Sequence, residues 1–94
     1  APSFFTLIKI YFINTYKQRF NEEPAINFAK DGKVVNRVAG LFKDINGAYR
    51  LIDAFLKSHK GRENGYTLSI CFSAHTINLW KAGELGEIIN VKIS

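Results

Sequence analysis

The sequence contains a single cysteine, Cys71, among its 94 residues. One cysteine excludes a disulfide bond within the chain and any zinc site built on two or more thiolates. Cys71 and His75 are spaced to share a metal ion on a helix, but two ligands do not complete a tetrahedral site and only His59 remains. We therefore predict no metal site, and a reducing, cytoplasmic location.

The sequence also lacks an uninterrupted apolar run of about 18 residues, the length that a membrane-spanning helix needs. Lys9 and Lys17 interrupt the apolar N-terminal region. The segment from Phe4 to Ile13 has neither the preceding basic region nor the small-residue cleavage site of a signal peptide. We expect this segment to belong to the mature fold, and we expect no membrane partner.

Motifs for catalysis and for nucleotide binding are absent as well. No serine has the flanking glycines of a nucleophile elbow, and no pair of carboxylates stands in an apolar setting. Asp31-Gly32-Lys33 lacks the spacing and the trailing Ser or Thr of a phosphate-binding loop. We predict a protein that is not an enzyme and that needs no cofactor.

Acidic residues are the scarcer charge, with eight Asp and Glu against thirteen Lys and Arg and a net charge of +5. Such an excess of positive charge favours an acidic partner. Apolar residues make up 47% of the chain and aromatic residues 14%, which indicates a folded domain rather than a disordered chain. We expect residues 1–94 to form a single domain, a fragment or module of a longer protein.

Apolar residues recur with helical spacing along most of the chain, which predicts a mainly α-helical, compact bundle of about four helices. The expected helices span about residues 3–20, 47–58 and 67–82, and a further helix starts between Asn27 and Lys33 and runs to about Phe42. Their expected N-terminal caps are Ser3 or Thr6, Asp31, and Thr67 or Ser69. Gly61 is predicted to end the third helix, and residues 61–65 to form the most mobile loop.

Three segments leave alternatives open. Residues 4–13 have β-branched and aromatic side chains that also allow a strand, although the helix is preferred because the pattern does not alternate cleanly. Residues 66–72 have β-branched and aromatic side chains that fit a strand about as well as a helix, although the helix is preferred. Residues 87–93 alternate weakly in polarity, which is consistent with a short strand or a tail.

The predicted core consists of apolar residues at helical spacing on the inward faces. They are Phe12, Val34, Val38, Leu41, Phe42, Leu51, Ile52, Phe55, Phe72 and Leu79. Among the remaining aromatic side chains, Tyr16 and Tyr49 are expected to be the exposed ones, available to stack on nucleic-acid bases.

The predicted second helix combines a core stripe with a basic face. Val34, Val35, Val38, Leu41 and Phe42 share one side of a helix, and the polar side chains of Lys30, Lys33, Asn36 and Arg37 are directed elsewhere. A basic face held away from the core suits contact with a phosphate backbone. The same pattern is also typical of an ordinary solvated helix.

The predicted first helix is apolar on more than one side. Its inward stripe contains Phe5, Ile8, Phe12 and Tyr16, and Tyr11, Ile13 and Phe20 widen it. An apolar surface of this width indicates either a helix buried on two sides or contact with a partner protein.

Three segments carry polar residues at fixed places within apolar patterns. They read Tyr16-Lys17-x-x-Phe20-x-x-Glu23-Pro24-x-Ile26-Asn27-Phe28-x-Lys30-Asp31-Gly32-Lys33, Leu51-Ile52-Asp53-x-Phe55 and Phe72-x-x-x-Thr76-Ile77-Asn78-Leu79. Together they resemble a small helical module of phage and mobile-element DNA replication proteins, over roughly Tyr11 to Leu79. The resemblance implies a DNA-binding or replisome-assembly module without catalysis of its own. The DNA-reading domain that often accompanies such modules has no counterpart here.

Charge pattern and resemblance together predict a non-catalytic nucleic-acid-binding module, with DNA as the expected partner. The predicted contacts are Lys17, Arg19, Asn27, Lys30, Lys33, Asn36 and Arg37; of these, the resemblance implies Lys17, Asn27, Lys30, Lys33 and Arg37. The alternative is a docking module that uses the wide apolar face of the first helix to bind a helicase, a polymerase or a second copy of the chain.

Overall fold

The computed structural model of the chain describes residues 3–85, and every regular element in this range is helical. The elements are α1 (Phe4–Phe20), α2 (Phe28–Val38), the 3₁₀ helix η1 (Ala39–Leu41), α3 (Ile45–Leu56), α4 (His59–Glu63), α5 (Leu68–Cys71) and α6 (Ala74–Lys81). The predicted mainly α-helical bundle is therefore confirmed. The strand or tail predicted for residues 87–93 lies outside the described residues.

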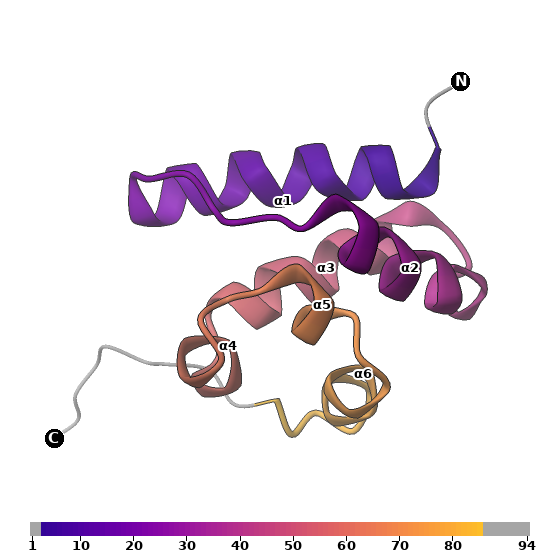
Figure 1. The fold of residues 1–94 in the computed structure, drawn as a ribbon. Coiled ribbons are helices and arrows are strands. Elements are labelled where there is room, and N and C mark those ends of the chain that lie inside the picture. Colours follow the sequence, from indigo (N-terminus) through magenta and orange to yellow (C-terminus); the bar gives the residue numbers. More distant parts are fainter. Residues whose placement is uncertain (1–2, 86–94) are drawn as a thin grey trace, which may run out of the picture.

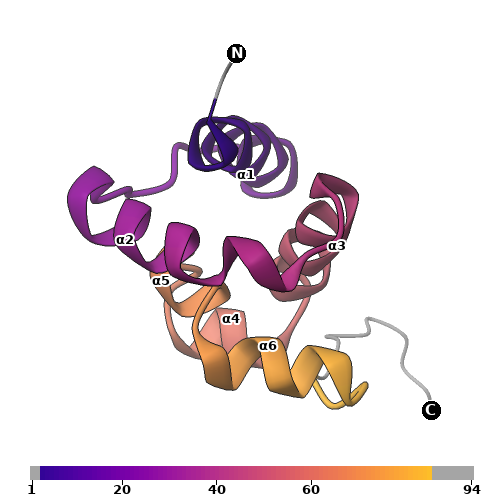
Figure 2. The same cartoon turned by 90° about the vertical axis from the view of Figure 1, so that its right-hand side faces the viewer.

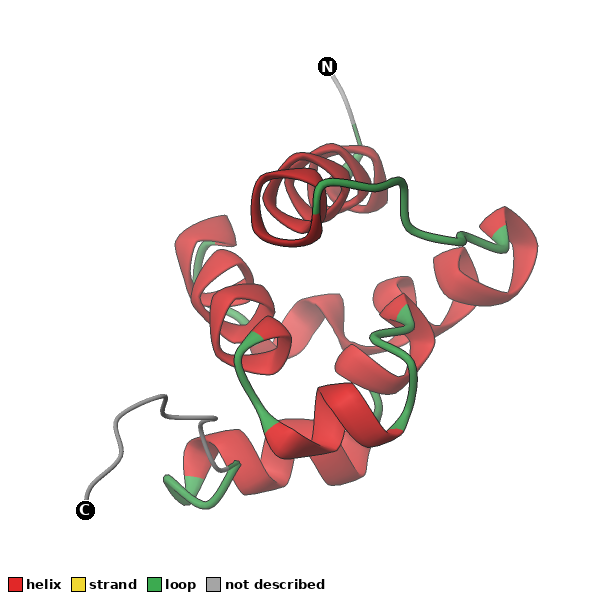
Figure 3. Ribbon diagram, turned by 90° about the vertical axis from the view of Figure 1, so that its left-hand side faces the viewer, coloured by secondary structure: helices red, strands yellow, loops and turns green. Residues whose placement is uncertain are grey.

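Helix α1 lies along one side of the molecule, and the chain then runs back beside it to reach α2 (Figure 1). In the view along α1 (Figure 2), α2 and α3 lie on the left and right below α1, and α6 lies on the side of the molecule opposite α1. Helix α1 packs on α2 and α3, α2 also packs on α5, and α3 contacts α4, α5 and α6. The loops between the helices are short, apart from the segment that joins α1 to α2 (Figure 3).

Helix α1 has the limits that the sequence predicts. The hydroxyl of Ser3 accepts a hydrogen bond from the backbone N–H of Thr6, which satisfies one of the free donors at the helix start. Ile8 and Phe12 are completely buried. Asn21 ends the helix in the left-handed conformation, with φ of 58°.

Helix α2 begins within the predicted range of Asn27 to Lys33, but at a different cap from the preferred one. Asn27, not Asp31, is the N-cap: its Oδ1 atom accepts from the backbone N–H of Lys30 at 3.0 Å. The Asp31 carboxylate lies one turn further on and accepts from the backbone N–H of Asn27, also at 3.0 Å. The two side chains thus form a reciprocal pair that resembles a capping box, and Asp31 stabilises the helix start from inside the helix.

Leu41 was predicted to be in the core and is 54% exposed, so that prediction is wrong. The α-helical turn ends at Val38, and residues 39–41 form a 3₁₀ turn with fewer residues per turn. The tighter winding rotates Leu41 away from the inward side. Of the other predicted core residues, Val34, Phe42 and Leu79 are partly buried, and the remaining six are buried.

Helix α3 begins and ends two residues earlier than predicted. Asp44 is its N-cap, with Oδ1 accepting from the backbone N–H groups of Asn46 and Gly47. The inward face holds Leu51, Ile52 and other fully buried side chains. Asn46 and Gly47 therefore lie in the first turn of the helix.

Gly61 does not end a helix, and residues 61–63 are not a loop, because they form part of α4. A Cβ atom at Gly61 would lie 2.3 Å from the carbonyl oxygen of Phe55, so no larger residue fits without a shift of the backbone. The backbone N–H of Gly61 donates to Ser58 Oγ, which itself donates to the same Phe55 carbonyl. The glycine is required for close packing and not for a turn.

The single fourth helix predicted for residues 67–82 is two helices, α5 and α6. Ser73 interrupts it and caps α6, accepting from the backbone N–H of Thr76. Thr67 occupies the N-cap position of α5 but makes no side-chain cap bond, and among the described residues its Oγ1 has no hydrogen-bond partner. The predicted closure after Ala82 is correct, since Gly83 follows with φ of 73°, and the strand alternative for residues 66–72 is wrong.

Tyr16 and Tyr49 are not the exposed rings that the sequence predicted, because both are half-buried. The Tyr49 ring stacks on Tyr11 with 4.1 Å between ring centroids. Tyr16 packs against Phe20 at 4.7 Å and also contacts Tyr66. These rings hold α1 onto its neighbours and do not form a free stacking surface.

Candidate nucleic-acid interface

The outer side of α2 presents the predicted basic residues. Buried Asp31, Gly32, Val35 and Val38 fix the rotation of this helix. Lys30, Lys33, Asn36 and Arg37 are all exposed. Because an α-helix has about 3.6 residues per turn, the three cations at positions i, i+3 and i+7 lie in one stripe. We call Lys30, Lys33 and Arg37 the basic stripe of α2.

No carboxylate within residues 3–85 forms a salt bridge with the basic stripe. Asp31, the acidic residue of α2, is only 4% exposed, and its carboxylate accepts from the backbone of Asn27. The salt bridge found within residues 3–85 lies outside α2 and joins Lys17 to Glu23 at 3.0 Å. The cations of the stripe are therefore not held in salt bridges within the described part of the chain.

Lys17 and Arg19 lie apart from the basic stripe. They belong to the last turn of α1, at the end where the chain turns back (Figure 1). Lys17 is paired with Glu23, and Arg19 Nε donates to the backbone carbonyl of Leu56, the last residue of α3, at 2.9 Å. Both have partners within the protein, so we do not include them in the interface.

Asn27 is close to the basic stripe but is held in the helix cap. Its Oδ1 atom is occupied by the backbone N–H of Lys30. The carboxamide NH₂ remains the group that it can offer to a ligand. Asn36 is exposed on α2, on the side of the stripe that faces α1.

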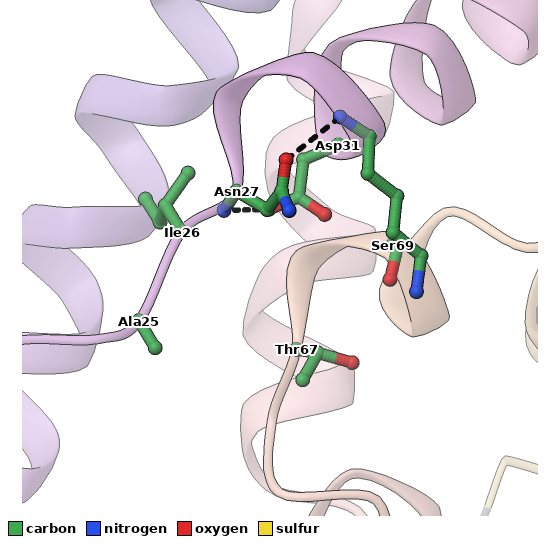
Figure 4. A pocket seen from close by; sticks show the side chains of 7 residues that line it. Ala25, Ile26, Asn27, Asp31, Thr67 and Ser69 are labelled. Carbon is green, nitrogen blue, oxygen red and sulfur yellow. Dashed lines mark hydrogen bonds between the residues drawn. The ribbon is translucent and has the colours of Figure 1, made fainter.

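A pocket of about 370 Å³ lies beside the N-terminal end of α2. Figure 4 shows Asn27 and Asp31 on one side of it, Ser69 and Thr67 across from them, and Ala25 and Ile26 at its margin. Lys30 also lines this pocket, so one lysine belongs both to the pocket and to the basic stripe. The pocket therefore extends the polar surface of α2 toward α5.

Phe28 and Lys9 form a feature that the sequence analysis missed. Phe28 is the first residue of α2 and is 61% exposed. Lys9 of α1 places its Nζ atom 4.7 Å from the centroid of the Phe28 ring. The signal in the sequence was an aromatic residue directly after the cap, at a helix end where few neighbours can cover it.

The pKa values that the fold shifts belong to groups away from α2. Burial raises the pKa of Tyr11 and Tyr16, and burial raises the pKa of Cys71 well above its ordinary value. Residues 3–85 contain no cluster of three or more metal-ligating side chains. None of the helices described has the length and apolar character needed to cross a membrane.

Comparisons of the chain with protein-family models, with curated proteins and with solved structures give no match.

Proposed function

We propose that this domain is a non-catalytic nucleic-acid-binding module that contacts the phosphate backbone through the basic stripe of α2. The observation that carries the proposal is the combination of three exposed cations on one helix face with the burial of Asp31. The inward side of α2 is fixed by Gly32, Val35 and Val38. The cations are thus presented on a rigid support, which is an advantage for binding a regularly charged partner.

The three cations in a row also favour DNA or RNA as the partner over a protein with scattered acidic residues. A partner with evenly spaced negative charges can occupy all three cations at once, and it releases condensed counterions when it binds. Three phosphate contacts correspond to a slope of log K against log salt of about −2 for a single strand and about −2.7 for a duplex. We propose DNA as the natural partner, in a replication-related setting, in keeping with the resemblance described above.

The test is fluorescence anisotropy of labelled oligonucleotides at about 50 and 200 mM salt. We expect the double variant Lys33→Glu/Arg37→Glu to lose measurable binding and to unfold at the same urea concentration as the unmodified protein. The matched control is Lys57→Glu/Arg62→Glu. This pair carries the same change of charge on exposed residues of the α3–α4 region, on the other side of the molecule.

Equal loss of affinity in both double variants would show that net charge alone drives binding and would contradict a site on α2. Absence of binding at 50 mM salt would contradict nucleic-acid recognition by this domain. Loss in the α2 variant alone supports the proposal.

A second function, protein docking through α1, is favoured by a separate observation. Ile10 is 49% exposed, and Leu7 and Ile13 lie three residues to either side of it, outside the buried cluster. The outer side of α1 therefore carries an apolar strip suited to a replication protein or a second copy of the chain. Light scattering across a concentration series tests self-association, which Ile10→Glu should abolish.

A further inference from the structure

The exposed ring of Phe28 stands out from the other aromatic side chains, because the phenylalanines and tyrosines of α1 and α3 lie in the core or pack against it. Phe28 is 61% exposed and forms no ring pair with another aromatic residue of the described part of the chain. Lys9 lies against the ring, 4.7 Å from its centroid, yet leaves more than half of the residue accessible. A phenylalanine this exposed gains little free energy from burial in the fold, and its ring remains accessible to a ligand.

Between Phe28 and the basic stripe, α2 itself carries no exposed acidic residue. Ala29 follows Phe28 and is also exposed, and Lys33 lies one helical turn further along the same side as Ala29. The small Ala29 side chain leaves this path open. Asp31, the acidic residue within this turn, faces inward. An anionic chain that contacts Lys33 can therefore continue over Ala29 toward Phe28 and Lys9.

We propose that Phe28 is a base-stacking residue and that the partner is single-stranded nucleic acid. This inference rests on the proposed function and specifies its ligand. Cationic surfaces combined with an accessible aromatic ring suit single strands, because unpaired bases can stack on the ring while phosphates contact the cations. The bases of a duplex are already stacked on each other and cannot cover Phe28 without unstacking. Lys9, whose Nζ lies over the Phe28 ring, supplies a positive charge close to a base that stacks on the part of the ring left accessible.

The experiment compares three probes of equal length by fluorescence anisotropy: a single-stranded oligonucleotide, its duplex, and an abasic strand with the same phosphates. We expect the single strand to bind more tightly than the duplex. Phe28→Ala should weaken single-strand binding about tenfold, the lower part of the range for loss of one stacked base. The same variant should bind the abasic strand as the unmodified protein does, because the phosphate contacts remain.

Two control variants separate stacking from other effects. Phe28→Tyr keeps an aromatic face and should keep the affinity. Ile10→Ala removes an apolar side chain that is 49% exposed from the outer side of α1 and should leave single-strand binding unchanged. Urea unfolding of Phe28→Ala establishes that the variant is folded at the assay temperature.

Equal affinity for the single strand and the abasic strand would overturn the stacking role of Phe28, while the phosphate site on α2 would stand. The variant Lys33→Glu/Arg37→Glu tests that phosphate site independently, and loss of affinity for all three probes supports it. Phe28-dependent binding to vesicles containing phosphatidylserine, without Phe28-dependent binding to the single strand, would overturn the proposal in favour of a membrane surface.

Discussion

The hydroxyl of Tyr11 lies 3.0 Å from both carboxylate oxygens of Asp53 and donates its hydrogen bond between them. This contact joins α1 to α3, and the stacked pair of Tyr11 and Tyr49 lies beside it. Burial raises the pKa of Tyr11 above its ordinary value of 10.0, and the hydrogen bond and the negative charge of Asp53 raise it further. The neutral phenol is thus part of what holds the two helices together.

Tyr11→Phe should therefore lower stability at neutral pH by about 1 kcal/mol, the net contribution of one hydrogen bond. The contribution of Tyr11 should be complete below about pH 10, where the unfolded phenol is neutral, and should be lost as the pH rises through the raised folded pKa. The loss of stability in alkali should accordingly be smaller in Tyr11→Phe. Urea unfolding from pH 7 to 11 measures both effects, and identical alkaline profiles would contradict the linkage.

Gly61→Ala should be strongly destabilising. The added Cβ would lie 2.3 Å from the Phe55 carbonyl oxygen and 3.1 Å from the Tyr66 ring, so the α3–α4 connection must shift. Overpacking of this kind costs about 1–3 kcal/mol or more. Gly40→Ala is the matched control, since nothing lies within 4 Å of a Cβ there. Equal urea midpoints for the two variants would disprove the close-packing role of Gly61.

Arg19 and Lys33 should separate stability from binding. Arg19→Gln removes the donor to the Leu56 carbonyl, and we expect a loss of about 1 kcal/mol of stability with a small change in oligonucleotide affinity. Lys33→Gln should do the reverse, because its side chain is exposed and makes no salt bridge within residues 3–85. Urea unfolding and anisotropy on both variants check this. A larger affinity loss from Arg19→Gln would place the interface at the end of α1.

The thiol of Cys71 should react only when the domain opens. Cys71 is fully buried, and burial raises its pKa well above the ordinary value, so the reactive thiolate is disfavoured as well as inaccessible. Alkylation in native buffer should be about a thousandfold slower than in denaturing urea, or slower still. Rapid stoichiometric labelling of the native protein would contradict this burial.

The buried sides of the longer helices could be predicted from the sequence, because their burial follows the helical period. Ile8 and Phe12 in α1, and Leu51 and Ile52 in α3, lie where the apolar spacing places them. The break at Ser73 was missed, because the apolar pattern continues through it. Spacing detects which side of a helix is buried, but it does not detect where a helix is interrupted.

The remaining wrong predictions concern features that depend on local contacts and not on the spacing of apolar residues. Asn27 and Asp31 are both good cap residues, and only their reciprocal hydrogen bonds show which one begins the helix. Glycine is a residue type that often ends a helix. At Gly61 it instead allows close packing against the carbonyl oxygen of Phe55, which is adjacent in space. Exposure at a helix end, as at Phe28, depends on which neighbours reach that far.

The positions of Phe28 and Arg37 have a consequence for the bound strand. The aromatic ring lies at the beginning of α2 and the guanidinium near its end, so the two ends of this surface are chemically different. On the proposed binding mode, the nucleotide whose base stacks on Phe28 and the nucleotide whose phosphate contacts Arg37 therefore lie at opposite ends of the bound segment.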